Sequence, residues 1–111
     1  MNYDKIKNEI KNFVEERDWE QFHSPKNLSM ALSVEASELV EIFQWQTQDE
    51  YQKNEEKVVN VVKDEVADIF YYVVRMCQKM NIDLENALFE KMKKNKQKYP
   101  ADKVKGKLAL G

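Results

Sequence analysis

Two pairs of acidic residues are spaced so that each pair falls on one face of a predicted helix. Glu35 and Glu38 form the first pair. Glu65 and Asp68 form the second pair after 26 intervening residues. Residues three positions apart are neighbours on a helix surface, so each pair can direct both carboxylates at one point. Mg²⁺ prefers such oxygen ligands and keeps other positions for water and substrate phosphates, so the spacing indicates a divalent-cation site.

Both pairs lie on apolar stripes, where a carboxylate is costly. The stripes recur at helical spacing and consist of Leu28, Leu32, Leu39 and Ile42 in one helix and Val58, Val62, Ile69 and Tyr72 in the next. Glu35 and Glu65 fall in the middle of these stripes, and the other two acids fall at the edges. Burying an ionised carboxylate without a partner costs several kcal/mol. Neither helix contains a histidine, and Arg75 falls to one side, so we expect a bound cation to compensate.

An alternative hypothesis is that these acids lie at the rim of the core or pair with lysines, as a single acidic pair at this spacing usually does. Two pairs centred on apolar stripes favour the metal site instead. A di-iron bundle would need Glu-x-x-His pairs, whereas the only histidine, His23, lies in a predicted connection. We therefore expect Mg²⁺ as the cofactor, with Mn²⁺ as its substitute.

The elements that position these acids are predicted to be long helices with few connections. The chain has 111 residues with only two glycines and two prolines, whereas a many-stranded sandwich needs a turn signal every ~8–12 residues. We expect helices over about 3–17, 25–45, 55–80 and 83–99, with a polar loop at 46–54. Ser24 and Asp83 are the expected N-caps of the second and fourth helices. The predicted fold is all-α and four-helix bundle-like, with the second and third helices antiparallel around the acids.

Composition limits the other classes of protein. The longest apolar run covers the six residues Ile69 to Val74, too short to span a bilayer. A net charge of −2 gives no sign of a nucleic-acid polymer as partner. The single cysteine, Cys77, excludes an internal disulfide, and no secretion signal follows Met1, so we expect a cytoplasmic protein without a membrane partner. We expect one domain over 1–111, with 101–111 as a loosely held basic tail.

Several segments resemble one protein family. The first acidic pair reads EASE and the second reads EVAD, which is similar to the E-x-x-E…E-x-x-D signature of the MazG-like all-α nucleoside triphosphate pyrophosphatase superfamily. The segments RDWEQFHSPKNL, EIFQW and KMKKNKQKYP resemble its dCTP pyrophosphatase branch. The resemblance runs from about Phe13 to Pro100, most of the chain.

This resemblance implies an enzyme that hydrolyses a nucleoside triphosphate to a monophosphate and diphosphate, acting on dCTP or related or modified deoxynucleotides in nucleotide-pool cleansing. It implies that the four acids are both catalytic residues and Mg²⁺ ligands, and we take Glu38 as the first choice of general base. It also implies a homodimer or homotetramer with sites near subunit contacts. A non-catalytic nucleotide- or metal-binding module and a structural helical oligomer stay open as alternatives.

The resemblance also assigns substrate-binding positions, which are Trp19, Glu20, Gln21, Phe22, His23, Trp45, Tyr72, Lys91 and Asn95. From spacing alone, the aromatic residues are more often core, and the lysines of the fourth helix form a solvated face favoured by the helix dipole. His23 is expected to contact the base rather than to act as an acid. Lys98 and Tyr99 share the face of Lys91, but we assign them no role.

One position departs from the family pattern. Some deoxycytidine-preferring relatives carry a histidine in the first helix, and the position that aligns with it here is Ile10. This difference leaves the preferred base open and does not affect the expected reaction.

Overall fold

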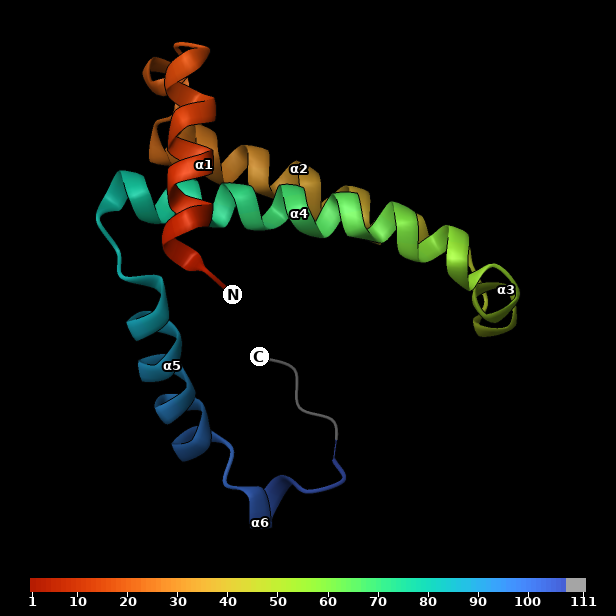
Figure 1. Ribbon diagram of the computed structural model, residues 1–111. Helices are drawn as coiled ribbons and strands as arrows, with labels where there is room; N and C mark the ends of the chain where they lie inside the picture. The colour runs from red at the N-terminus through yellow and green to blue at the C-terminus, as the bar shows by residue number, and fades with distance from the viewer. Residues whose placement is uncertain (108–111) are drawn as a thin grey trace. The chain divides into compact units, whose positions relative to one another are not determined.

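The computed structural model describes residues 1–107, and every regular element in that range is a helix. In chain order the elements are α1 (Tyr3–Glu16), the 3₁₀ helix η1 (Glu20–Phe22), α2 (Pro25–Phe43), α3 (Gln48–Lys53), α4 (Glu55–Met80), α5 (Leu84–Lys98) and α6 (Ala101–Val104) (Figure 1). The all-α prediction is confirmed. The chain forms two compact units, the first ending at Asn81 and the second beginning at Ile82. The single domain expected over 1–111 stays a prediction.

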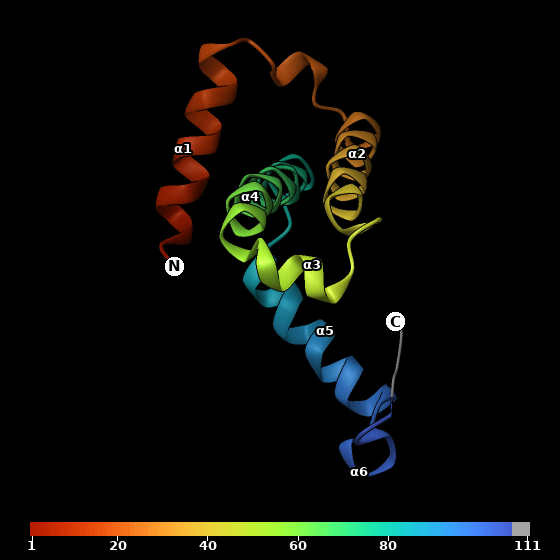
Figure 2. The ribbon, with the colours of Figure 1, turned by 90° about the vertical axis from the view of Figure 1, so that its right-hand side faces the viewer.

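The first unit is built around α4. Helices α2 and α4 lie side by side and antiparallel, as predicted, and the short α3 lies at the turn between them (Figure 1). Figure 2 shows α4 between α1 and α2, and α4 contacts each of the other three helices of this unit. The α2–α4 pair therefore provides the frame on which the acidic residues are placed.

The apolar core of this unit is small. Its most deeply buried side chains are Val14 of α1, Leu28 of α2 and Val74 of α4, each exposed by 1% or less. Leu28 lies near the start of α2 and Val74 near the end of α4, which is the same end of the antiparallel pair. Val58 is buried near the start of α4, at the opposite end of the pair. Removing these side chains from water is the main source of stability for the unit.

The helix ends follow local rules that the sequence shows. The Ser24 side chain accepts a hydrogen bond from the backbone N–H of Asn27, with Pro25 at the first helical position, and Asp83 accepts one from Asn86 in the same way. Both predicted N-caps are confirmed. Helix α4 ends at Met80, and its C-cap Asn81 has a φ of 55°, a left-handed conformation that asparagine tolerates.

One boundary prediction is wrong, and the loosely held tail over 101–111 stays a prediction. The segment 46–54 was expected to be a loop, but it contains α3. Thr47 caps this helix by accepting from the backbone N–H of Glu50, and acidic residues in the first turn suit the helix dipole. The expected basic tail contains the one-turn helix α6, and its last positions, 108–111, lie outside the described residues.

No helix within residues 1–107 is both long enough and apolar enough to cross a membrane. This result agrees with the short apolar runs of the sequence.

We expect Leu28→Ala to lower the free energy of unfolding by about 2–5 kcal/mol, because it leaves a cavity among nearly inaccessible neighbours. The measurement is urea unfolding followed by circular dichroism, with an unchanged slope against denaturant. Lys26→Ala, at an exposed position of the same helix, is the matched control and should change stability by less than about 0.5 kcal/mol. Equal stability of the two variants would contradict the assigned core.

Candidate functional site

The middle of the α2–α4 pair brings acidic side chains from both helices together. One carboxylate oxygen from each of Glu35, Glu38 and Glu65 lies within 4.8 Å of the other two. Asp68 follows one turn later on α4, outside this group of three, but its charge still raises the pKa values of Glu35 and Glu65. The structure thus places three of the four expected ligands at one point and the fourth beside them.

Two of these carboxylates have oxygens without partners. Glu35 and Glu65 are half-buried, and the Oε2 atom of each is inaccessible to solvent and makes no hydrogen bond. Glu38 is exposed. Within residues 1–107, none of the ion pairs involves these three acids, so the alternative of pairing with lysines is not what the structure shows. A buried polar atom without a partner is costly, so these two oxygens are candidates for contact with a bound cation.

The acidic cluster (Glu35, Glu38, Glu65 and Asp68) brings like charges close together in a partly desolvated place. Burial, helped by the neighbouring Glu38 and Glu65 carboxyls, raises the pKa of Glu35 to about 7. Burial also raises the pKa of Glu65. Closely spaced carboxyls cannot all ionise without a compensating cation. Because the donors are all hard carboxylate oxygens, the cluster fits Mg²⁺ or a similar divalent ion.

A row of aromatic rings connects the segment before α2 to the acidic cluster. The ring centroids of Trp19 and Phe13 lie 5.5 Å apart, those of Phe13 and Tyr71 lie 5.9 Å apart, and those of Tyr71 and Tyr72 lie 4.9 Å apart. All three contacts are edge-to-face, the geometry that aromatic pairs prefer. Tyr72 lies one turn after Asp68 on α4. Burial raises the pKa of Tyr72, and the charges of Glu35 and Asp68 raise it further.

Phe13 and Tyr71 are members of this row that were not among the expected site residues. Phe13 was expected only as an apolar position of the first helix, and Tyr71 precedes the expected contact Tyr72. The only signal in the sequence is that both are aromatic residues at helical spacing, which is also typical of core residues. Their exposure differs from that of a core residue, because neither ring is fully buried.

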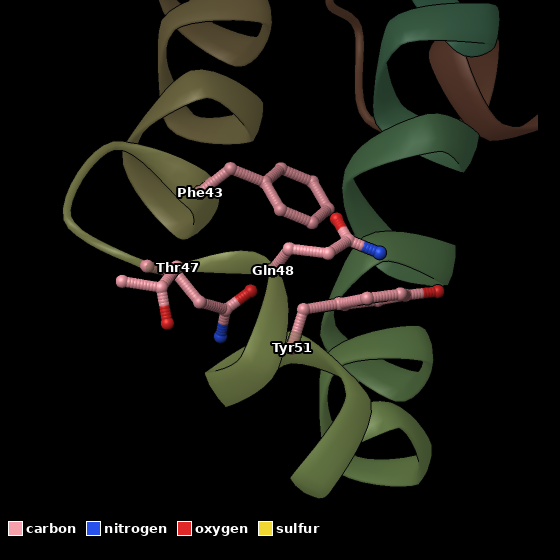
Figure 3. A pocket seen from close by; sticks show the side chains of 5 residues that line it. Phe43, Thr47, Gln48 and Tyr51 are labelled. Atoms are coloured by element: carbon pink, nitrogen blue, oxygen red, sulfur yellow. The ribbon is translucent and has the colours of Figure 1, made fainter.

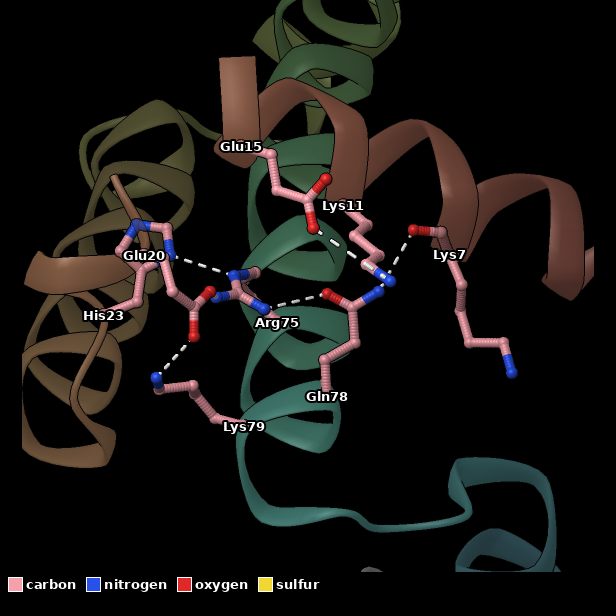
Figure 4. A network of polar contacts seen from close by, with 8 residues as sticks. All are labelled: Lys7, Lys11, Glu15, Glu20, His23, Arg75, Gln78 and Lys79. Atoms are coloured by element: carbon pink, nitrogen blue, oxygen red, sulfur yellow. Dashed lines mark hydrogen bonds and ion pairs between the residues drawn. The ribbon is translucent and has the colours of Figure 1, made fainter. Parts of the chain in front are cut away.

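Polar contacts hold the Trp19–His23 segment against α4 (Figure 4). Glu20 accepts hydrogen bonds from Arg75 and, at 2.6 Å, from Lys79, and the Lys79 contact holds the pKa of Glu20 below its usual value. Arg75 Nε donates to His23 Nδ1 at 2.9 Å. The side chains of Glu20 and His23 are thus already hydrogen-bonded to residues of α4.

The rest of the segment is more open. Gln21 donates through Nε2 to the backbone oxygen of Asp18 at 3.0 Å. Trp19 is 41% exposed and Phe22 is 59% exposed, so both rings remain accessible.

The expected contact Trp45 follows the end of α2 and is 85% exposed. Beside it in the sequence lies a pocket of about 360 Å³ lined by Phe43, Gln46, Thr47, Gln48 and Tyr51 (Figure 3). Gln46 Oε1 is inaccessible to solvent and has no hydrogen-bond partner. Trp45 does not line this pocket.

The expected phosphate-binding residues belong to the second unit. Lys91 is an exposed residue of α5, and Asn95 is half-buried and donates to Met92 Sδ at 3.8 Å. Their part in the site stays a prediction.

Known proteins resemble this chain over most of its length. Residues 30–107, which include all four acids, match the model of the MazG-like family. The chain is 40% identical over 96 residues to dCTP pyrophosphatase 1 of Rattus norvegicus, a match that covers 85% of this chain and 56% of that protein. It is 41% identical over 91 residues to dCTP pyrophosphatase 1 of Homo sapiens, covering 80% and 54%. The chain thus spans about half the length of the curated relatives it matches.

A solved structure also matches. The crystal structure of a pyrophosphatase from Archaeoglobus fulgidus superposes with a TM-score of 0.83 at 35% sequence identity, over 90% of this chain and 94% of that one. The resemblance noted from the acidic pairs and the WEQFH segment is confirmed. Because the family model covers well over half of the residues, the chain belongs to the MazG-like family.

Proposed function

We propose that the protein is a metal-dependent nucleoside triphosphate pyrophosphohydrolase, which cleaves a triphosphate into a nucleoside monophosphate and diphosphate. The observation that carries this proposal is the convergence of Glu35, Glu38 and Glu65, two of them with unpartnered buried oxygens. The names of the similar proteins, dCTP pyrophosphatase and pyrophosphatase, support the same reaction.

Mg²⁺ is the proposed cofactor, with Mn²⁺ as a substitute, held by Glu35, Glu38 and Glu65 and by Asp68 beside them. When bound, the ion supplies charge neutralisation for the triphosphate and acidifies a water molecule. Chemistry of this kind consists mainly of positioning and electrostatic stabilisation, so the chain needs no nucleophilic side chain. Glu38 is the proposed general base, because its exposed carboxylate can receive a proton from the attacking water.

The proposed substrate is dCTP or a related or modified deoxynucleotide, and the proposed role is the cleansing of the deoxynucleotide pool. Trp19 and Tyr72, at the two ends of the aromatic row, offer faces on which a base can stack. Trp45 adds a further exposed ring, and Lys91 and Asn95 are the proposed phosphate contacts. Similarity to the named dCTP pyrophosphatases supports these assignments.

We also propose that the protein acts as a homodimer or homotetramer in the cytoplasm. The first unit exposes large apolar side chains on both helices of the pair, namely Met30, Val34, Val40, Val59, Val61 and Val66. Exposed apolar side chains, where they gather into a patch, mark interaction sites in proteins. A free, unpaired Cys77 and a nucleotide substrate fit a cytoplasmic location.

We expect Glu38→Gln to lower diphosphate release from dCTP by about 100-fold or more, because the amide keeps the shape but can neither bind a cation well nor accept a proton. The measurement is a coupled diphosphate assay with excess Mg²⁺. Glu41→Gln, an exposed acid on the same helix, is the control and should keep wild-type turnover. Wild-type turnover in Glu38→Gln would remove the role assigned to this residue, and nucleotide binding without any release would favour the non-catalytic module.

We expect Mg²⁺ to raise the melting temperature of the wild-type protein, because an ion that binds only the folded state adds about 2.7 kcal/mol at 100 times its Kd. Glu65→Gln should abolish most of this rise, since Glu65 supplies one of the converging oxygens. Glu41→Gln should keep it. The measurement is thermal unfolding with EDTA and with increasing MgCl₂ or MnCl₂. A melting temperature that does not respond to either ion would support the structural-oligomer alternative instead.

A further inference from the structure

Arg75 is a buried cation for which the proposed chemistry has no use. Arg75 is 4% exposed, and no other charged residue within 1–107 is buried. It lies outside the acidic cluster, two turns after Asp68 on α4. A buried guanidinium is tolerated only when its donors are satisfied, so its partners indicate its purpose.

The three partners of Arg75 come from two parts of the first unit, the segment before α2 and α4 itself (Figure 4). Nη2 forms an ion pair with Glu20, and Nε donates to His23 Nδ1 at 2.9 Å. Nη1 donates to Gln78 Oε1 at 3.0 Å, and Gln78 Nε2 donates in turn to the backbone oxygen of Lys7 at 3.0 Å. Arg75 therefore links the segment before α2 both to α4 and, through Gln78, to α1.

Arg75 makes two of the contacts that hold η1 to α4, and the Lys79–Glu20 ion pair makes another. None of the three residues of η1 is buried, and the ring of Trp19, the N-cap of η1, contacts Phe13 of α1. Glu20 and His23 bracket the turn, and Arg75 binds both of them. With its two ends held in this way, the segment presents the exposed rings of Trp19 and Phe22 in fixed positions.

The contact with Arg75 also fixes the state of His23. A guanidinium can only donate hydrogen bonds and does not lose its proton in proteins, so His23 Nδ1 must be the acceptor. The single proton of the neutral ring then resides on Nε2. Burial and the charges of Arg75 and Lys79 lower the pKa of His23, and the charge of Glu20 opposes them.

We propose that Arg75 is a positioning residue of the nucleotide site, which holds the Trp19–His23 segment against α4 and fixes His23 as a neutral hydrogen-bond donor through Nε2. This inference rests on the proposed function, since it takes the segment to be part of the substrate site. A ring fixed in this way offers a donor and no acceptor. It therefore fits a carbonyl oxygen or an unprotonated ring nitrogen of a base, such as those of cytosine.

The first test is spectroscopic and does not depend on activity. His23 is the only histidine, so a long-range ¹H–¹⁵N correlation spectrum of the full chain reports on this ring alone. We expect the neutral ring to carry its proton on Nε2 and to leave Nδ1 bare. A protonated Nδ1 in the neutral ring would overturn the proposal, whether or not the protein hydrolyses dCTP.

Two variants move the pKa of His23 in opposite directions. Arg75→Met removes the donor and the positive charge, so we expect the pKa of His23 to rise towards its ordinary value of about 6.5 and the tautomers to mix. Glu20→Gln removes the negative charge that opposes Arg75, so the pKa of His23 should fall further. Glu20→Gln also keeps the test decisive if Arg75→Met does not fold. No shift in either variant would contradict the proposed contact.

The second test separates positioning from general stability. We expect Arg75→Met to raise the KM for dCTP by roughly tenfold with a smaller change in kcat, because a displaced segment weakens substrate binding in the ground and transition states alike. Lys11→Met, which removes an exposed cation paired with Glu15 on α1, is the control and should change neither constant. An unchanged KM in a folded Arg75→Met protein would overturn the positioning role. Absence of dCTP hydrolysis in the wild type would instead overturn the proposed function.

Discussion

The strongest constraint on the structure is the repulsion among the carboxylates that α2 and α4 hold close together. Oxygens of Glu35, Glu38 and Glu65 lie within 4.8 Å of one another, and two of these residues have buried oxygens without partners. Such an arrangement opposes the packing of the two helices unless a cation compensates it. The buried apolar residues of α4 accordingly fall on both sides of the cluster, with Val58 before it and Val74 after it. Apolar packing stabilises the two ends of the helix pair, and the acidic cluster occupies the middle.

A single face of α4 carries the groups that organise the site. Glu65, Asp68, Tyr72, Arg75 and Lys79 follow one another at alternating intervals of three and four residues, which places them along one stripe of a helix. The first two are acids of the cluster, the third ends the aromatic row, and the last two bind Glu20. The connection between α1 and α2 is therefore attached to the same helix that carries Glu65 and Asp68 of the acidic cluster. Rigidity of α4 over 26 residues keeps these groups in register.

The periodic spacing of apolar residues was enough to predict the long helices of this fold. The stripes around Glu35 and Glu65 indicated the antiparallel pair, and the capping residues indicated where two of the helices begin. Helix α3 was missed because six mostly polar residues show no apolar period, and Thr47 as its N-cap is the only local signal. The contacts of Arg75 could not be predicted from the sequence, for another reason. Its partners His23 and Glu20 are 52 and 55 residues away in the sequence, in a turn whose path no period describes.

The departure at position 10 gains a physical meaning from this network. Ile10 is a buried core residue of α1, so the position that carries a histidine in some deoxycytidine-preferring relatives contributes packing in this chain. The one imidazole left is His23, and its Nδ1 is occupied by Arg75. A ring that can only donate favours base edges rich in acceptors and disfavours edges that present a donor at the same place, because two facing donors leave both unsatisfied. In the proposed site, discrimination among bases would depend on which edge meets His23 Nε2, and Arg75 would set that preference through its contact with Nδ1.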